Sequence, residues 1–521
     1  MPYYFAATRN ILLDNQERQK MPEHESENKK DQAEDERARR SERLARLTEL
    51  CGNPFEIARF DKTHSAAEVK QQFATLVAGE KTDKSVSVAG RVMAIRNSGM
   101  FIDILDHSGR IQIFHNLKEI SSLRAAMLKL LDLGDIIGVD GTVRRTPRGE
   151  ITVDANDLKV LCKALEPPPE KFHGLQDIDA RFRHREQDLV ANLRTREILR
   201  ARYKMVSAMR GFLENLGFLE VETPMLHTIA GGALAKPFVT HHNALVMPLY
   251  LRIAPELHLK RLVIGGIAEK VYEINRCFRN EGLSPKHNPE FTSLEVYQAY
   301  VDFTAMIDLT EAIIHHVAVK LHGTPKVIFR DIEIDLTPPW PRRSMLDLIQ
   351  EHTGVDFAGI SNAGGAWGAA RDIGVEVEKG VSWGQVVEAV FGHKVESKLI
   401  QPIHVIDLPK EISPLAKGWP DRPQVAQRFE TYINGWEIAN AFSELNDPRE
   451  QRKRFEEQAE QKRGPDEPPH PIDEDFLKAL AFGMPPMGGL GIGIDRLGML
   501  MTDSASIREV IAFPTMRPIT H

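Results

Sequence analysis

Residues 278–297 read FRNEGLSPKHNPEFTSLEVY, two strand-like runs separated by a short polar loop. Because side chains alternate along a strand, Phe291, Glu295 and Tyr297 share one face of the second run. An aromatic ring, a carboxylate and a phenol on one face indicate a pocket. Arg279 in the first run can hold a phosphate through two N–H groups, and an aromatic ring opposite can stack on a nucleobase. An ordinary sheet with a surface ion pair would carry the same residues.

A second segment, residues 430–444, reads ETYINGWEIANAFSE and is expected to form a strand. Its carboxylates Glu430 and Glu437 are ligands suited to a hard cation such as Mg²⁺. Surface acids are the alternative, but the apolar residues between them leave little room for solvent, so we predict a buried site. The residues expected to share one face of this strand are Asn440, Phe442 and Glu444.

A third segment, residues 488–500, reads GGLGIGIDRLGML. Alternating glycines let a backbone approach a ligand closely, and Arg496 at the start of the following helix can clamp a phosphate. A glycine-rich strand packed tightly on a helix is the alternative. The spacing differs from GxGxxG, and GxxxxGK[ST] is absent, which argues against a Rossmann fold and a Walker-type ATPase. Together the three segments indicate an ATP site without a P-loop.

The region upstream, between residues 85 and 165, consists of short β-type runs, with one helical pattern after the third run. Five strands and one helix predict an OB-type barrel, a fold that often binds single-stranded nucleic acid. The expected strands are Val86–Ile95, Phe101–Leu105, Ile111–Phe114, Ile136–Val143 and Ile151–Val160. The expected helix is Leu117–Leu131.

The domain organisation follows from these patterns and from a proline-rich hinge. We predict a charged N-terminal extension that is partly disordered or helical (1–50), an OB-type domain (51–166), a linker (167–180) and a catalytic domain (181–521). In the extension, Leu44, Leu47 and Leu50 would form one stripe of a solvated helix. The catalytic domain is expected to be α+β around an antiparallel sheet, with a helix at Thr195–Leu216 and strands at Val271–Cys277, Phe291–Tyr300 and Thr431–Leu445.

Composition narrows the class of protein. The 521 residues include only three cysteines, none in a CxxC pair, so neither a disulfide framework nor a cysteine zinc site is indicated. No apolar run approaches the roughly 18 residues that span a bilayer, and the N-terminus lacks a signal-peptide pattern, so we predict a cytoplasmic protein with no membrane partner. The net charge of −7 leaves RNA open as a partner, because a local basic patch can bind it.

The three segments, in this order, resemble the signature motifs of class II aminoacyl-tRNA synthetases. Residues 217–226 look like the first motif of that family, whose helix and strand form its dimer interface. The resemblance sharpens to lysine–tRNA ligases at IAGGA (229–233), YLRIAPEL (250–257), HNPEFT (287–292) and FSELND (442–447). It implies a homodimer that activates L-lysine with ATP to lysyl-adenylate and transfers it to the 3′ end of tRNA(Lys).

The resemblance also implies roles for individual residues of the ATP site. Arg279 and Arg496 would be the catalytic residues, each on the ATP phosphates, and Phe291 would stack on adenine. The other ATP contacts would be Glu281, His287, Asn288 and Glu437. The Mg²⁺ ligands would be Glu430 and Glu437.

For the amino acid, the resemblance assigns the lysine α-amino group to Gly232 and Glu256. The residues that would enclose the lysine side chain are Glu295, Tyr297, Asn440, Phe442 and Glu444. A buried ammonium needs carboxylate partners, which agrees with this assignment. Ala439 and Ala441 replace the glycines that usually flank the pocket asparagine, so a changed amino-acid preference is possible.

For the barrel, the positions that match the anticodon contacts of the family are Phe101, Gln112 and Glu150. Phe101 can stack a base, and the other two can hydrogen-bond its edge. Arg96 is the nearest candidate for the arginine that precedes this aromatic residue in the family.

Two other functions fit parts of the pattern. A related ligase that attaches lysine or a modified lysine to a protein fits Ala439–Asn440, but such ligases lack an anticodon barrel. An inactive RNA-binding paralogue would be expected to have lost ATP contacts, yet Arg279, Phe291, Glu437 and Arg496 are all present.

Overall fold

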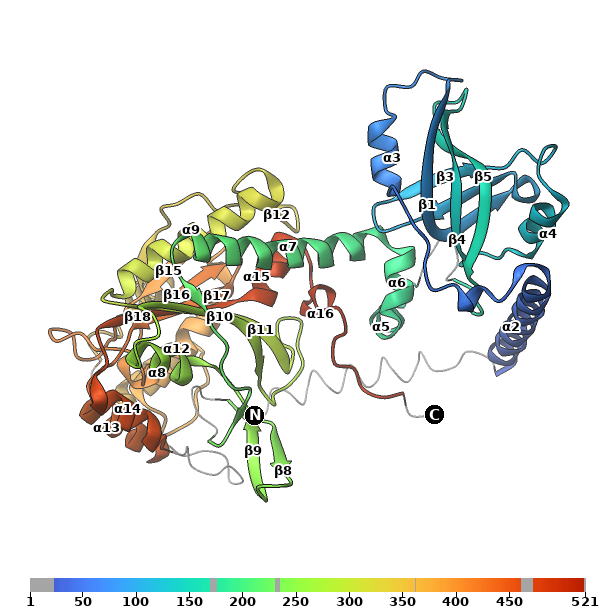
Figure 1. The fold of residues 1–521 in the computed structure, drawn as a ribbon. Coiled ribbons are helices and arrows are strands. Elements are labelled where there is room, and N and C mark those ends of the chain that lie inside the picture. The colour runs from blue at the N-terminus through green and yellow to red at the C-terminus, as the bar shows by residue number, and fades with distance from the viewer. Residues whose placement is uncertain are drawn as a thin grey trace. The chain divides into compact units, whose positions relative to one another are not determined.

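The chain divides into two compact units, Met1–Asp177 and Ile178–His521 (Figure 1). The computed structural model describes residues 23–168, 175, 177–229, 235–360, 362–460 and 472–519. The division between the units falls inside the linker predicted at 167–180. None of the helices in these ranges is both long and apolar enough to cross a membrane.

An eight-stranded sheet forms the centre of the second unit, in the order β14-β15-β16-β17-β18-β11-β10-β6. Only the outermost pairs, β14–β15 and β10–β6, are parallel; the other neighbours are antiparallel. This arrangement confirms the predicted α+β class. The strands are β6 (Leu219–Glu220), β10 (Lys270–Phe278), β11 (Glu290–Ala299), β14 (Arg342–Ser344), β15 (Ile403–Ile406), β16 (Arg428–Ile433), β17 (Trp436–Ser443) and β18 (Met487–Gly493).

Three helices pack on one face of this sheet: α7 (Leu193–Asn215), α9 (Phe303–His322) and α15 (Ile494–Met501). Their apolar residues share one buried core with strand residues such as Leu294, Val296 and Ile492. The predicted helix at Thr195–Leu216 corresponds to α7 within two residues. The opposite face of the sheet is therefore free to carry polar side chains.

The segment predicted as a single strand at Thr431–Leu445 is instead a hairpin, so this expectation was wrong. Strands β16 and β17 pair around Asn434 and Gly435, whose φ angles are 55° and 64°. Asn-Gly is favoured where two successive residues need positive φ, which explains the turn. Glu430 and Glu437 consequently lie on different strands, and Glu444 lies one residue beyond β17.

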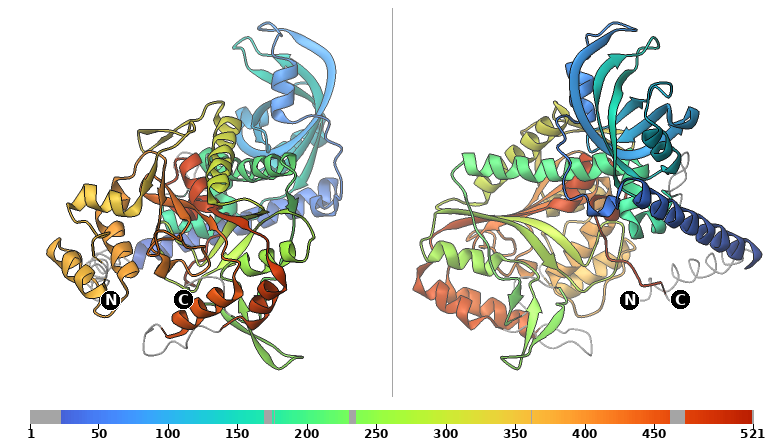
Figure 2. Two further views of the ribbon diagram at one scale, coloured as in Figure 1. Left: turned by 90° about the vertical axis from the view of Figure 1, so that its left-hand side faces the viewer. Right: turned by 45° about the vertical axis from the view of Figure 1, so that its right-hand side comes forward.

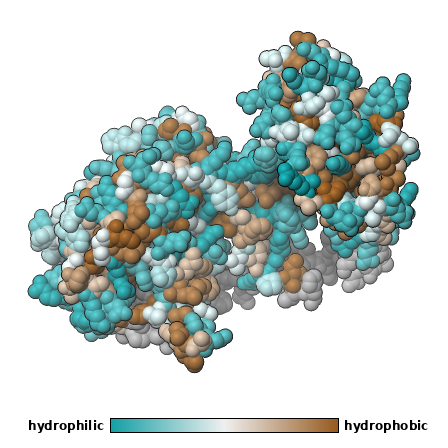
Figure 3. Space-filling model, in the orientation of Figure 1, coloured by the Kyte–Doolittle hydropathy of each residue, from teal (hydrophilic) through white to brown (hydrophobic). Residues whose placement is uncertain are grey.

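Smaller elements complete the second unit. Helices α10, α11 and α12 form a core of their own, and Figure 2 shows them gathered at one side of the unit. A three-stranded sheet in the order β7-β9-β8 carries the exposed Val239, Leu245 and Val246, seen as the hydrophobic tip at the bottom of Figure 3. The helices are α5 (Ile178–Arg183), α6 (Arg185–Ala191), α8 (Glu256–Ile264), α10 (Met345–Thr353), α11 (Ala363–Asp372), α12 (Trp383–Lys394), α13 (Pro448–Glu460), α14 (Glu474–Gly483) and α16 (Ile507–Val510). The strands are β7 (Leu226–His227), β8 (Val239–His242), β9 (Met247–Leu251), β12 (Lys326–Phe329) and β13 (Ile332–Asp335).

The first unit contains a closed five-stranded barrel in the order β1-β2-β3-β5-β4, which confirms the predicted OB-type fold. Its α4 begins later than expected, because the Ser121 side chain accepts a hydrogen bond from the Arg124 backbone N–H and so caps the helix there. The elements are α3 (Ala66–Gln72), β1 (Lys81–Arg96), β2 (Phe101–Leu105), β3 (Arg110–Phe114), α4 (Ser122–Leu130), β4 (Ile136–Arg145) and β5 (Ile151–Cys162).

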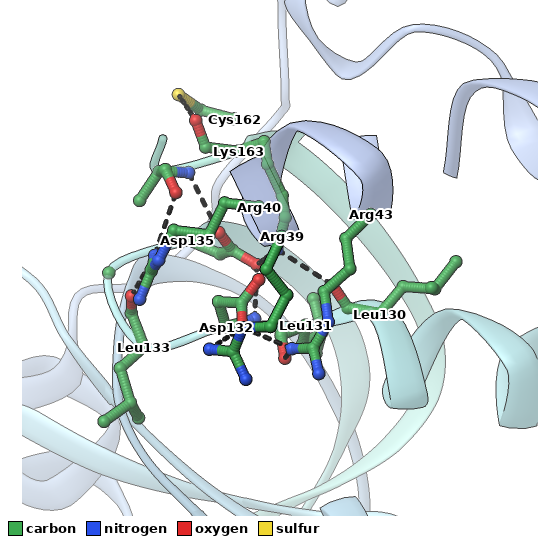
Figure 4. Close-up of polar contacts among 12 residues, drawn as sticks. Arg39, Arg40, Arg43, Leu130, Leu131, Asp132, Leu133, Asp135, Cys162 and Lys163 are labelled. Atoms are coloured by element: carbon green, nitrogen blue, oxygen red, sulfur yellow. Dashed lines mark hydrogen bonds and ion pairs between the residues drawn. The ribbon is translucent and has the colours of Figure 1, made fainter. Parts of the chain in front are cut away.

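The N-terminal helix α2 (Glu23–Cys51) was predicted to be solvated, and this was wrong for its C-terminal half. Leu47 is buried in the barrel core, and Arg40 is only 3% exposed. The Arg40 guanidinium donates hydrogen bonds to the carbonyl oxygens of Leu133 and Ala164, at 3.0 and 2.9 Å. Arg40 and Arg43 therefore bond to acceptors of the barrel instead of facing solvent, as Figure 4 shows.

A buried charge cluster lies beneath this helix (Figure 4). The Lys163 ammonium donates to the carboxylates of Asp132 and Asp135, at 2.6 and 2.7 Å, and to the Leu130 carbonyl at 2.8 Å. Arg43 of α2 forms an ion pair with Asp132 from the other side. Lys163 therefore neutralises two acids that have no access to solvent.

We predict that Lys163→Met destabilises the full-length protein by about 3–5 kcal/mol, because two buried carboxylates lose their shared cation. Urea denaturation of the full chain, followed by circular dichroism, measures this change. Lys159→Met is the matched control, since Lys159 lies exposed on β5, the strand that Lys163 directly follows, and its loss is expected to cost no more than about 0.5 kcal/mol. Equal stability of the two variants would contradict a stabilising role for the cluster.

Candidate active site

A cavity of about 290 Å³ opens on the sheet face opposite α7 and α9. Alternation along β11 explains its position, because Leu294 and Val296 enter the core while Phe291, Glu295 and Tyr297 face the cavity. The other predicted site residues that border it are Glu256, Arg279, Glu281, His287, Asn288, Glu437, Asn440, Phe442 and Arg496. Glu430 and Glu444 are close to lining residues but do not line the cavity themselves, and Gly232 lies outside the described residues.

One end of the cavity is lined by cationic groups and an aromatic ring. The Arg279 guanidinium carbon lies 5.1 Å from the centroid of the Phe291 ring. Its Nε has no hydrogen-bond partner among the described residues, although it is buried. A buried N–H group without an acceptor is costly, so this end of the cavity is suited to an anionic ligand with a ring to stack.

Arg496, at the start of α15, reaches the same end of the cavity. Its guanidinium donates hydrogen bonds to the Glu437 carbonyl oxygen at 2.8 Å and to Nε2 of His287 at 3.0 Å. Burial, with a further contribution from Arg496, lowers the pKa of His287, so the ring is a neutral acceptor. Arg496 is thus held in place and retains N–H groups for a ligand.

The position of α15 is fixed by its neighbour Asp495. This buried carboxylate accepts hydrogen bonds from the Arg202 guanidinium of α7 at 2.6 Å and from the Thr292 backbone N–H at 2.7 Å. Thr292 is next to Phe291 in β11. Asp495 therefore ties the Arg496 helix to the strand that carries the stacking ring.

The opposite end of the cavity is acidic. Ser293 donates a hydrogen bond of 2.9 Å to Glu295, and the Tyr297 hydroxyl lies 3.5 Å from the other Glu295 oxygen. Burial, and next the nearby Glu256 carboxylate, raises the pKa of Glu295 to about 7. A cationic ligand beside Glu295 would lower this pKa again, because an opposite charge favours the ionised carboxylate.

The glycines of the third segment make room for these acids. A β-carbon at Gly489 would lie 2.0 Å from a Glu444 oxygen and 2.7 Å from the Tyr297 ring, and one at Gly491 would lie 3.2 Å from both Glu295 oxygens. Gly488 faces the other way, where a β-carbon would meet Met306 of α9 at 2.9 Å. The strand thus serves both roles considered for it, close packing on a helix and space for the site.

Glu430 and Glu437 form the candidate cation site. The Glu430 carboxylate accepts hydrogen bonds from Arg428 at 2.5 Å and from the Tyr432 hydroxyl at 2.7 Å. Burial raises its pKa to about 7, with Glu437 and Glu388 adding to the effect and Arg428 opposing it. These oxygen donors repel one another, and a divalent cation would relieve this repulsion, so they fit Mg²⁺. Within the described ranges, no group of three or more His, Cys, Asp or Glu is placed to hold a metal ion.

The two alanines that flank Asn440 point away from the acidic end. Ala439 and Ala441 belong to the buried core on the helix side of the sheet, while Asn440 and Phe442 border the cavity. Ala439 also contributes to the cavity wall. The Ala441 methyl group therefore adds no bulk to the cavity.

The barrel presents its predicted contact residues on one outer face. The Phe101 ring lies 5.2 Å from that of Phe114, over which the Arg144 guanidinium sits at 3.9 Å. Gln112 is on the same face and accepts a hydrogen bond of 3.0 Å from the Thr152 hydroxyl. Arg96 pairs with Phe101 in the strand register and forms two hydrogen bonds of 2.7 Å with Asp103. Glu150 is exposed at the β4–β5 turn, 3.3 Å from Lys70.

Lys260 was not among the site residues predicted from the sequence. It is 1% exposed and lies at the acidic end of the cavity. It follows Glu256 by four residues in α8, and the two side chains are 2.5 Å apart. The spacing of four residues between Glu256 and Lys260 predicts an ion pair on a helix, but such pairs usually lie on exposed helix faces, so it did not indicate a buried site.

Comparison with known proteins identifies the class. Residues 177–517 match the family described as "tRNA synthetases class II (D, K and N)", and residues 86–161 match "OB-fold nucleic acid binding domain". The fold is thus that of a class II tRNA synthetase. A lysine–tRNA ligase of Carboxydothermus hydrogenoformans is 53% identical over 92% of this chain and 97% of its own length. A lysine–tRNA ligase of Pelotomaculum thermopropionicum is 52% identical over 92% of this chain and 94% of its own length. One of Rhizobium meliloti is 50% identical over 92% of this chain and 96% of its own length. The chain belongs to the lysine–tRNA ligase family.

Proposed function

We propose that this protein joins L-lysine to tRNA(Lys) in two steps, using ATP to form lysyl-adenylate. The observation that carries the proposal is the polarity of a single cavity. One end presents the Arg279 guanidinium, whose Nε is unpaired among the described residues, beside the Phe291 ring, and the other presents buried carboxylates. A nucleoside triphosphate fits the first end and the ammonium groups of lysine fit the second.

In the first step, the lysine carboxylate attacks the α-phosphorus of ATP in line. A new O–P bond forms, the bond to the β-phosphate bridging oxygen breaks, and pyrophosphate leaves with its electron pair. Arg279 and Arg496 neutralise charge on the phosphates, and Phe291 fixes the adenine by stacking. Glu430 and Glu437 would hold Mg²⁺, which supplies further charge neutralisation. No protein nucleophile is needed, because positioning the two substrates supplies much of the acceleration.

In the second step, the terminal ribose hydroxyl of the tRNA attacks the carbonyl carbon of lysyl-adenylate and displaces AMP. The barrel would bind the anticodon, with Phe101 as the stacking surface and Gln112 and Glu150 as base contacts. Arg96 and Arg144 border this surface and favour a phosphate backbone. The remaining ATP contacts in this proposal are Glu281, His287 and Asn288.

The pocket carboxylates predict a pH dependence for lysine use. Glu295 must be ionised to bind an ammonium group, and its pKa of about 7 means that it gains a proton as pH falls through that value. The lysine side chain stays charged over this range, because its pKa is about 10.4. We expect the KM for lysine to rise below pH 7, approaching about tenfold per pH unit. Exchange assays between pH 6 and 8 measure it, and a KM independent of pH would contradict the assignment of Glu295.

We expect Phe101→Ala to raise the KM for tRNA about five- to hundredfold, the range that corresponds to losing one base stack. Pyrophosphate exchange, which needs no tRNA, should be unchanged. Phe55→Ala is the matched control, because Phe55 is half exposed in the same unit but outside the barrel strands. Charging kinetics with purified tRNA(Lys) test the prediction, and equal KM values for the two variants would remove Phe101 from the anticodon site.

The molecule that receives lysine distinguishes the proposed activity from that of a ligase that lysylates a protein. The OB-fold domain favours tRNA, because it is a nucleic-acid-binding module. Charging assays with radiolabelled lysine, bulk tRNA and nuclease-treated controls decide between them. Label that becomes acid-precipitable only with intact tRNA supports the proposal, and label on protein contradicts it.

We further propose a homodimer and a cytoplasmic location. The dimer would use the motif-1 region, where the edge strand β6 presents Leu219, 43% exposed, beside the equally exposed Leu216. Exposed apolar residues on a sheet edge invite pairing with a second copy. Light scattering after gel filtration should give twice the 58.7 kDa mass of one chain, and a monomer at micromolar concentration would contradict the dimer.

A further inference from the structure

Lys260 places a permanent ammonium group at the acidic end of the cavity. It lies on α8, one turn after Glu256, and its Nζ is 2.5 Å from a Glu256 oxygen. The same Nζ forms an ion pair with Glu444, which is fully buried. Lys260 therefore connects two of the carboxylates proposed to bind the amino-acid substrate.

Aromatic rings surround this ammonium on the remaining sides. Its Nζ lies 5.5 Å from the Phe442 ring, 5.8 Å from Phe476 of α14 and 6.0 Å from Tyr297. A cation enclosed by rings and carboxylates is stabilised there without water. Burial opposes the charge, but Glu256 and Glu444 together raise the pKa of Lys260, so it stays protonated.

Glu444 depends on this cation. Its Oε2 forms the ion pair with Lys260, its Oε1 has no hydrogen-bond partner in the described part of the chain, and both oxygens are buried. Burial holds the pKa of Glu444 above its ordinary value although the Lys260 ammonium lowers it. One oxygen faces Gly489, which borders the cavity. Glu444 is thus held by Lys260 on one side and directed toward the substrate on the other.

The net charge of the side chains at the acidic end is equal and opposite to that of the two ammonium groups of lysine. When Glu256, Glu295 and Glu444 are all ionised, as binding of a dication requires, they carry three negative charges, and Lys260 carries one positive charge, so two negative charges remain. Lysine brings two ammonium groups, one on its α-carbon and one on its side chain. Arg252 does not alter this count, because it pairs with Glu273 at 2.8 Å, and Arg279 lies at the phosphate end.

We propose that Lys260 is a positioning residue for lysine: it holds Glu256 and Glu444 in place and sets the pocket charge to match the two ammonium groups of the substrate. The inference rests on the proposed function and deepens it. It assigns specificity to a residue that would not touch the reacting atoms, because Lys260 acts through two carboxylates.

The test compares Lys260→Met with Lys260→Arg in lysine-dependent pyrophosphate exchange. Methionine matches the shape of the lysine stem but has no charge, whereas arginine keeps the charge and is larger. Arg261→Met is the matched control, because Arg261 is the next residue of α8 and is exposed. The charged groups that contact Lys260 are Glu256 and Glu444, and Glu295 lies next to Glu444. The rings that face Lys260 are those of Tyr297, Phe442 and Phe476, and the other charged residues of α14, Glu474, Asp475 and Lys478, are exposed.

For Lys260→Met we expect the KM for lysine to rise about thirtyfold or more, the ratio that corresponds to about 2 kcal/mol for breaking a buried charge pair. The KM for ATP should change little. The rise of the lysine KM at low pH should also begin at a higher pH than in the parent protein, because the carboxylates lose the cation that lowers their pKa. Lys260→Arg should keep the parental pH profile, and Arg261→Met should resemble the parent in every respect.

Several outcomes would overturn the inference. A parental lysine KM and pH profile in Lys260→Met would show that the charge is not used. Better function in Lys260→Met than in Lys260→Arg, or loss of folded protein in both by circular dichroism, would assign Lys260 to packing alone. Absence of lysine-dependent exchange in the parent protein is a separate result, which would contradict the proposed function itself.

Discussion

Arg279→Ala lowers kcat/KM for lysine-dependent pyrophosphate exchange by about a thousandfold or more, the magnitude typical of removing a cation that stabilises transferring phosphoryl charge. The Nε–H of this guanidinium is buried and unpaired among the described residues, and the guanidinium carbon lies 5.1 Å from the centroid of the Phe291 ring. It therefore has capacity for a ligand that no described side chain uses. Arg279→Lys should recover only part of the loss, because a lysine cannot form the paired N–H contacts of a guanidinium.

The control for this variant is Arg276→Ala, because Arg276 lies in β10, the strand that Arg279 directly follows. The Arg276 guanidinium donates to the Thr292 hydroxyl at 2.8 Å and lies 3.3 Å from Glu290, and it does not border the cavity. Its removal should change exchange only severalfold. Near-parental exchange in Arg279→Ala would remove this residue from the phosphate site.

Gly489→Ala will raise the KM for lysine by about a hundredfold, because displacement of site groups by about 1 Å costs this much. The new methyl group would lie 2.0 Å from a Glu444 oxygen and 2.7 Å from the Tyr297 ring. Strand β18 cannot move away, since Gly489 pairs with Tyr297 of β11 on one side and Phe442 of β17 on the other. The carboxylate and the phenol must shift instead.

A matched substitution separates this local effect from a general cost of alanine. Gly368, in α11, has open space where its β-carbon would be, and a helix favours alanine over glycine. Gly368→Ala should leave both KM values unchanged. Gly489→Ala should also keep its KM for ATP within about threefold, since the steric conflict is confined to the acidic end. A parental lysine KM in Gly489→Ala would contradict the placement of the amino acid.

The parts of the fold that follow a local period could be predicted from the sequence. The five barrel strands and the hairpin of β10 and β11 were found because alternation is a property of each strand by itself. The same alternation placed Phe291, Glu295 and Tyr297 together, and the structure brings them to one cavity. The turn at Asn434–Gly435 could also have been predicted, because Asn-Gly is a strong hairpin signal. The continuous apolar pattern on both sides of it favoured a single strand instead.

Other features depend on partners that no local pattern contains. The docking of α2 follows from barrel carbonyls and from Asp132, which lie about ninety residues downstream of Arg40 and Arg43. Lys260 was overlooked for a similar reason, because its burial depends on Glu444 and on the rings of Phe442 and Phe476 from distant segments. Charged residues in a helix are usually solvated, and only the assembled fold shows which of them are not.

Amino-acid-dependent pyrophosphate exchange tests the central claim most directly, with the purified full-length protein, ATP, Mg²⁺ and each standard amino acid or β-lysine in turn. The proposed function predicts exchange that depends on lysine, at a rate well above that with any other standard amino acid. Equal or faster exchange with another amino acid would contradict the assignment of the acidic pocket to lysine. No exchange with any of them would contradict catalysis by this site.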